Sequence, residues 1–330
     1  MLGDATAMQD EINKPIFVVG SPRSGTSILA WCLGQHPNLI VIPESNWMGQ
    51  FAINVAISYD IGSARGDRSL LSGMDIGCEE FFANFGRSIN HLILSHRKDL
   101  DRKRKMTRPS PEPKTRWVNQ TPEYSLHICG LRKLFPEALF VHILRDVTSV
   151  VRSMLNFHRV NGIQLVASEQ EAYDYWLRTV SSCLDAEHAY GPRVVHRLRY
   201  SDLINSPEST LRSVFQFLGE PYAIACLNPL RKRINSSNVP PDFQPDDPHT
   251  DPTLVAKARS LSAELEEKPQ REHASLEMER KLEAAFKQRV QYVGQTTSEY
   301  QKSQQVIYEL RTRPNELQKL LRASPAPSAS

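Results

Sequence analysis

The sequence has 330 residues, 40% of them hydrophobic, and a formal net charge of +3, which is too small to indicate a nucleic-acid partner. No apolar run approaches the roughly 20 residues that cross a bilayer, and the first residues lack the basic and apolar regions of a secretory signal. The five cysteines are scattered without a C-x-x-C pair. We therefore expect a cytoplasmic protein with reduced thiols, no disulfides and no metal centre.

Strand and helix patterns alternate along most of the chain. Strands are predicted at 16–19, 39–42, 138–144 and 193–198, and helices at 24–35, 51–57, 81–94, 122–134, 147–157, 170–190, 207–218 and 254–266. Such alternation is typical of βαβ units around a mostly parallel sheet. The expected fold class is α/β, a three-layer αβα domain over residues 13–266.

Two segments lack regular patterns. Arg97–Arg116 is strongly basic and rich in proline, so we predict an exposed or mobile loop, with an attractive surface for an anionic acceptor as the alternative. Val239–Pro252 contains five prolines and is predicted to be a loop.

A helical extension is predicted over residues 267–322. From Arg271 the chain is rich in Glu, Lys and Gln with spaced apolar residues, which indicates amphipathic helix broken again at Pro314. The extension either packs on the core or pairs two chains into a homo-oligomer, or it is a partly frayed end. Residues 323–330 are expected to be disordered.

The first strand runs into the turn GSPRSGTS, which spans 20–27 and is followed by a helix. This is almost the G-x-x-x-x-G-K-[ST] phosphate loop, but Thr26 stands in the lysine position and Arg23 places a charge inside the turn. Backbone N–H groups at the start of a helix favour an anion. The turn therefore predicts a phosphate-binding site without the usual lysine.

A second cation follows a later strand. The apolar run 138–144 ends in Arg145, directly before Asp146. An arginine at this point suits a further phosphate better than a magnesium ion. The two arginines together predict a nucleotide with two separated anionic groups.

Four motifs in order carry a family resemblance: GSPRSGTS followed by HP, PE at 43–44, FPEALFVHILRDVTSVVRSM, and RYSDLINSPESTLRSVFQFLGEP. They resemble the sulfotransferases that use 3′-phosphoadenosine 5′-phosphosulfate (PAPS), especially the bacterial branch and the protein-tyrosine sulfotransferases. The resemblance covers residues 15–266. It implies a P-loop-like α/β fold, PAPS as donor, 3′,5′-ADP as product and no required metal.

The resemblance also implies roles for individual residues. Arg23 would contact the bridging oxygen and the departing 5′-phosphate, while Arg145 and Ser153, eight positions apart, would hold the 3′-phosphate. Tyr200 would lie near that phosphate. The residues expected to contact the cofactor are Ser21, Pro22, Arg23, Ser24, Gly25, Thr26, Ser27, Arg145, Ser153, Tyr200 and Ser237.

Glu44 is the candidate catalytic base. It lies 21 positions after Arg23, the spacing at which the tyrosine sulfotransferases carry a catalytic glutamate. A carboxylate that follows a parallel strand would face the ligand crevice, where it could take the proton of a hydroxyl. The alternative is a solvent-facing acid before the next helix. His36 and His142 are expected to be structural.

Gln120 marks a departure from the family pattern, since many relatives carry a lysine there that would neutralise charge on the transferring group.

The predicted function is sulfuryl transfer from PAPS to a hydroxyl of a carbohydrate or another small metabolite. Two alternatives remain: a Mg-ATP-dependent kinase or NTPase with a degenerate loop, and a weakly catalytic binding or scaffold module that acts through its helical arm.

Overall fold

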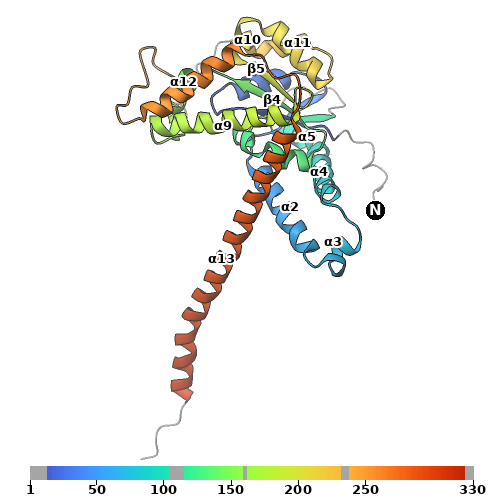
Figure 1. Ribbon diagram of the computed structural model, residues 1–330, viewed down its shortest axis with the longest axis vertical. Helices are drawn as coiled ribbons and strands as arrows, with labels where there is room; N and C mark the ends of the chain where they lie inside the picture. The colour runs from blue at the N-terminus through green and yellow to red at the C-terminus, as the bar shows by residue number, and fades with distance from the viewer. Residues whose placement is uncertain (1–12, 104–114, 159–161, 232–237, 324–330) are drawn as a thin grey trace, which may run out of the picture.

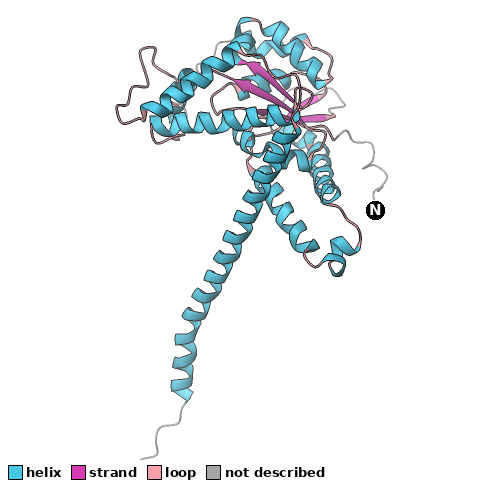
Figure 2. Ribbon diagram, in the orientation of Figure 1, coloured by secondary structure: helices cyan, strands magenta, loops and turns pink. Residues whose placement is uncertain are grey.

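The protein is an α/β structure built on one parallel sheet (Figures 1 and 2). The computed structural model describes residues 13–103, 115–158, 162–231 and 238–323. Within these ranges five strands pair in the order β2-β3-β1-β4-β5, and every pair is parallel. The strands are β1 (Ile16–Val19), β2 (Leu39–Val41), β3 (Arg116–Asn119), β4 (Leu139–Leu144) and β5 (Val195–Arg199).

Helices cover both faces of the sheet, which confirms the expected three-layer α/β class. On one face lie α1 (Thr26–Leu33), α10 (Tyr200–Asn205), α11 (Pro207–Leu218) and the 3₁₀ segment η4 (Ile224–Arg231). On the other lie α2 (Trp47–Ser63), α4 (Cys78–Ser95), η3 (Pro122–His127), α6 (Ile128–Leu134), α7 (Val147–Leu155), α9 (Glu169–Tyr190), α12 (Pro252–Glu267) and the start of α13 (Leu276–Ala323). The short η2 (Gly66–Arg68) and α3 (Leu70–Gly73) join α2 to α4, and α5 (Arg97–Lys103) follows α4.

The alternation of side chains along β1 divides the core in two. Ile16 and Val18 pack with α1 and α11, whereas Phe17 and Val19 pack with α2, α4 and α6. All four side chains are fully buried. A strand covered on both faces reads as a continuous apolar run, which explains why the sequence pattern located β1 so well.

The chain connections diverge at the carboxyl ends of β1 and β4. These strands are neighbours, with Ile16 opposite Leu139 and Val19 opposite His142. The chain leaves β1 toward β2 at one side of the sheet and leaves β4 toward β5 at the other. Ligands of open α/β sheets bind where adjacent connections diverge in this way. The loop 20–27 and Arg145 both lie at this point.

Several local predictions were wrong. Arg116–Asn119 forms β3, although Arg116 had been assigned to the basic loop, and Arg97–Lys103 forms α5. Residues 122–127 form a 3₁₀ segment rather than the start of an α-helix, and α13 continues through Pro314 without a break. The remainder of the basic segment, 104–114, and the tail 324–330 lie outside the described residues.

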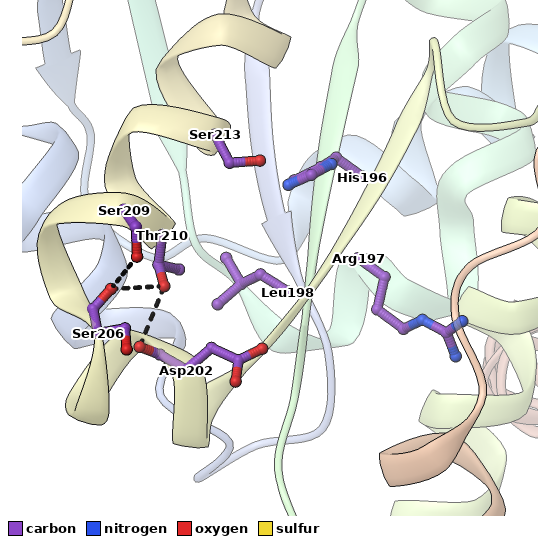
Figure 3. A pocket seen from close by; sticks show the side chains of 8 residues that line it. All are labelled: His196, Arg197, Leu198, Asp202, Ser206, Ser209, Thr210 and Ser213. Atoms are coloured by element: carbon purple, nitrogen blue, oxygen red, sulfur yellow. Dashed lines mark hydrogen bonds between the residues drawn. The ribbon is translucent and has the colours of Figure 1, made fainter.

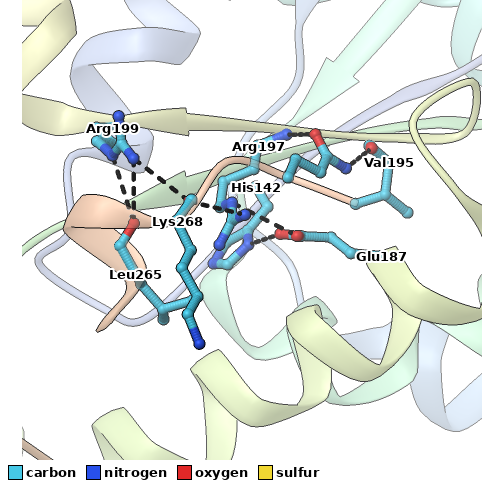
Figure 4. Close-up of polar contacts among 8 residues, drawn as sticks. His142, Glu187, Val195, Arg197, Arg199, Leu265 and Lys268 are labelled. Atoms are coloured by element: carbon cyan, nitrogen blue, oxygen red, sulfur yellow. Dashed lines mark hydrogen bonds and ion pairs between the residues drawn. The ribbon is translucent and has the colours of Figure 1, made fainter. Parts of the chain in front are cut away.

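The connection between α12 and α13 is held along the edge strand β5 (Figure 4). The Gln270 side chain pairs there with two backbone groups of β5. Its Oε1 accepts from the Arg197 N–H at 2.9 Å, and its Nε2 donates to the Val195 carbonyl at 2.5 Å. Arg199 donates to the carbonyls of Leu265 and Lys268. The two Gln270 contacts satisfy backbone groups of the β5 edge that would otherwise remain open to another strand.

The first turns of α13 pack on the α2, α6 and α9 layer, and the rest of the helix leaves the domain (Figure 1). Lys133 pairs with Glu283 at 2.7 Å, and Phe286 packs on Gly130 so closely that a Cβ on Gly130 would lie 2.9 Å from Phe286 Cε2. Val290 is buried. No helix among the described residues is long and apolar enough to cross a membrane.

Candidate active site

The loop after β1 is fixed by backbone geometry that only glycine accommodates at two positions. Gly20 has φ 148° and Gly25 has φ 108°, and Arg23 adopts φ 69° between them. A Cβ on Gly20 would lie 2.5 Å from the Ile143 carbonyl oxygen. Glycine is therefore required both by the left-handed region and by the close approach of the loop to β4.

Two serines hold the loop closed. Ser24 donates from its backbone N–H and from its Oγ to the carbonyl of Ser21, at 3.1 and 2.6 Å. Both side chains are buried. Ser21 and Ser24 therefore belong to the loop's own scaffold. Gly25, the N-cap of α1, offers no side-chain acceptor to the first turn, which begins at Thr26. N–H groups at such an uncapped helix start can bind an anion.

The structure brings together three of the expected phosphate contacts, although they lie far apart in the sequence. Arg23 donates from Nε to Ser153 Oγ at 3.2 Å, and Arg145 donates from Nη1 to the carbonyl of Arg23 at 3.1 Å. Asp146 caps α7 by accepting from the Ser149 N–H at 2.8 Å, which fixes the helix that carries Ser153.

Tyr200 links the two halves of this cluster. The Arg145 guanidinium lies 4.5 Å from the centre of the Tyr200 ring, a cation–π contact. The same ring packs against the loop, because a Cβ on Gly25 would lie 2.6 Å from Tyr200 Cδ2. Arg23 makes a similar contact, 4.6 Å from the Phe157 ring centre. Both arginines are thus oriented by aromatic faces.

The cluster gathers two positive charges. Burial and, next, the charge of Arg145 lower the pKa of Arg23, with a smaller opposing effect from Glu44. Arg145 forms no ion pair with a carboxylate in the described part of the chain. Two guanidinium groups held together in a partly buried site are destabilised unless an anion joins them.

Glu44 lies beside this cluster. Its pKa is raised above the usual range, first by burial and then by Glu123; the Arg23 charge and a hydrogen bond from Ser27 act in the opposite direction. Ser27 thus contacts Glu44, and its expected cofactor contact stays a prediction. A carboxylate with a raised pKa is a better proton acceptor.

The end of β3 fixes the segment that carries Glu44. Thr121 Oγ1 accepts from the Ser45 N–H at 2.8 Å, and Tyr124 Oη donates to the carbonyl of Ser45. Asn119 Nδ2 donates to the Pro43 carbonyl at 3.5 Å. Side chains about 75 positions later in the sequence therefore hold the residues on both sides of Glu44 in place.

Gln120 lies in the same segment at the end of β3. It is buried, only 8% exposed, and its Oε1 has no hydrogen-bond partner among the described residues. Glu123 follows shortly after Gln120, and Tyr175 Oη donates to Glu123 Oε1 at 3.0 Å. Sequence reasoning missed this pair because a single Glu and Tyr, 52 positions apart, give no recognisable spacing.

Two histidines have structural partners, as expected. His36 Nε2 contacts the Pro221 carbonyl at 2.8 Å, and His142 Nδ1 contacts Glu187 at 2.5 Å in the core (Figure 4). Ser237 lies outside the described residues, so its expected cofactor contact stays a prediction. The described residues contain no group of three or more His, Cys, Asp or Glu arranged for a metal.

A hollow between β5 and α11 lies apart from this cluster (Figure 3). Its hydroxyl groups serve the local helices: Ser209 donates to the Ser206 carbonyl at 3.1 Å, and Thr210 donates to the carbonyls of Asp202 and Ser206 at 3.0 and 2.8 Å. These hydroxyls cap turns rather than converge on a ligand.

Comparison with known proteins assigns the family. The model of the sulfotransferase family matches residues 15–223, which include the loop, Glu44, Arg145, Ser153 and Tyr200. The chain belongs to the sulfotransferase family.

Among the relatives of this chain is the omega-hydroxy-beta-dihydromenaquinone-9 sulfotransferase Stf3 of Mycobacterium bovis, 30% identical over 109 residues, or 31% of this chain and 28% of that protein. Protein-tyrosine sulfotransferase 1 of Danio rerio is 24% identical, over 64% of this chain and 55% of that protein. The chain thus spans about half or less of the length of these relatives.

A solved structure, the sulfotransferase domain from the curacin biosynthetic pathway, is 18% identical over 82% of this chain and 96% of that chain, with a TM-score of 0.42.

Proposed function

We propose that this sulfotransferase moves a sulfuryl group from PAPS to a hydroxyl of a small-molecule acceptor. The observation that carries the proposal is the pairing of Arg23 with Arg145 at the carboxyl ends of β1 and β4, beside an uncapped helix start and a carboxylate with a raised pKa. Two guanidinium groups held close together fit a donor that carries two separated anionic groups.

The residues divide between the two ends of such a nucleotide. The first-turn N–H groups of α1 and Arg23 would hold the 5′ end, in the manner of other helix-start phosphate sites. Arg145 and Ser153 would hold the 3′-phosphate. Bound PAPS would supply the activated sulfuryl group and a stable leaving nucleotide, 3′,5′-ADP.

Glu44 is proposed as the base. Its position beside Arg23 and Glu123 suits removal of the acceptor's hydroxyl proton, and its raised pKa increases its basicity. Arg23 would stabilise negative charge that develops on the departing phosphate. Prearranged donors of this kind lower the barrier without reorganising during the reaction.

The test is a calorimetric titration of the full chain with 3′,5′-ADP, 5′-ADP and Mg-ATP. The titration is repeated with Arg145→Ala and with Arg178→Ala, an exposed arginine on α9 that serves as the control. Wild type and control should bind 3′,5′-ADP at least tenfold more tightly than 5′-ADP without metal, and Arg145→Ala should remove most of this difference.

Preference for Mg-ATP would overturn the proposal in favour of a kinase or NTPase. Absence of all nucleotide binding would favour a binding or scaffold module. Either result would leave the family assignment intact, because the match to residues 15–223 does not depend on activity.

A further inference from the structure

A row of aromatic rings leads away from Glu44 along the seam between α2 and α4. It starts at the first residue of α2, three positions after Glu44, and crosses to α4 and back. Consecutive ring centres are 5.7, 5.8, 5.0 and 5.6 Å apart. In order of contact, the rings belong to Trp47, Phe51, Phe85, Phe81 and Tyr59.

Part of this row faces solvent. Trp47 is 44% exposed and Phe85 37% exposed, while the other three rings are half-buried, Phe51 and Phe81 against the core. Beyond the row, Ile61, Leu70 and Met74 around α3 are 72%, 71% and 64% exposed. Exposed apolar side chains that follow a candidate reactive group so closely in the chain favour a ligand-binding face.

The row offers few polar contacts. Tyr59 carries the one hydroxyl among its rings, and that hydroxyl donates to the Ile76 carbonyl at 3.2 Å. A carbohydrate needs several side-chain donors and acceptors to replace its hydration, because burying a hydroxyl without a hydrogen-bond partner is unfavourable. An apolar body needs none and gains from burial against the rings.

We propose that the acceptor is an elongated apolar alcohol or phenol whose body lies along this row and whose hydroxyl reaches Glu44. This inference rests on the proposed function. In the transfer, the acceptor oxygen forms a bond to sulfur and its proton passes to Glu44. The bond between sulfur and the bridging oxygen breaks, and its electron pair leaves with 3′,5′-ADP.

The experiment compares octan-1-ol, 2-naphthol and glucose as acceptors with PAPS, following release of 3′,5′-ADP. The variants are Trp47→Ala and Phe85→Ala, with Trp31→Ala as the control, because Trp31 is 48% exposed on α1, outside the row. Octan-1-ol and 2-naphthol should be the better acceptors. Trp47→Ala should raise their KM about tenfold with little change in kcat, and Trp31→Ala should change neither.

A second readout separates this inference from the proposed function. The same three acceptors are titrated calorimetrically into protein saturated with 3′,5′-ADP. If 3′,5′-ADP binds but glucose is the better ligand, or if Trp47→Ala and Trp31→Ala behave alike, the apolar acceptor is overturned and PAPS-dependent transfer stands. If 3′,5′-ADP does not bind, the proposed function is overturned, and the inference that rests on it is overturned with it.

Discussion

Arg145 donates a hydrogen bond from Nη1 to the backbone carbonyl of Arg23, 122 positions earlier in the chain, at 3.1 Å. The side chain that ends β4 thereby fixes the backbone of the loop that ends β1. Its guanidinium also lies 4.5 Å from the Tyr200 ring centre. One residue thus connects three carboxyl-end segments of the sheet, and its orientation depends on an aromatic face.

Replacing Tyr200 should therefore weaken nucleotide binding indirectly. Tyr200→Leu removes the face that orients Arg145 and loosens the contact with Gly25. A cation–π contact is worth about 0.5–2 kcal/mol, so affinity for 3′,5′-ADP should fall about 2- to 30-fold by calorimetry. Tyr200→Phe keeps the ring and should stay close to wild type. A loss in Tyr200→Phe equal to that in Tyr200→Leu would assign the effect to the hydroxyl instead.

The pH dependence of turnover should reveal Glu44. A base must be deprotonated, so kcat/KM should fall as the pH drops through a pKa above the usual 4.5 for this group. Glu123→Gln removes a neighbouring negative charge that raises this pKa, so the midpoint should move to lower pH. Glu44→Gln should lower kcat at least about 100-fold. An unchanged midpoint in Glu123→Gln would show that the two carboxylates do not interact.

The ion pair of Arg116 with Glu220 should be important for stability. The pair is buried, with N···O 3.1 Å, and Arg116 also donates to the carbonyls of Lys14 and Leu218, both at 2.7 Å. Arg116→Met leaves a buried carboxylate without its cation and should cost about 3–5 kcal/mol in urea unfolding. The double variant with Glu220→Leu should lose less than the sum of the single losses. Additive losses would mean that the two charges are not coupled.

His127 should make the fold sensitive to mild acid. Burial and, less strongly, Arg289 of α13 lower its pKa to about 4. The unfolded chain, with a histidine pKa near 6.5, then binds more protons between these values, so stability is full above pH 6.5 and falls toward pH 4. Relative to His127→Gln, the wild type should lose about 2 kcal/mol between pH 7 and pH 5. Parallel stability curves for the two proteins would exclude this role.

The sequence alone determined the α/β class, because strands buried on both faces appear as uninterrupted apolar runs such as 16–19 and 138–144. It also located the loop 20–27 and Arg145, since a glycine-rich turn after one buried strand and an arginine after another leave a local signature. Ser153 was indicated only by the family resemblance. The strand β3 escaped detection. Its four residues, RWVN, follow a basic segment, and their burial comes entirely from neighbours distant in sequence.

Only the tertiary structure decided which side chains share the site. The hydrogen bond from Arg23 to Ser153, the Tyr200 face under Arg145 and the Glu123 carboxylate near Glu44 all join segments that the parallel crossovers bring together. No local pattern encodes such contacts, because they depend on how whole elements pack. The same holds for α13: periodicity indicated an amphipathic helix, but packing decided that its first turns lie on the domain and the rest projects from it.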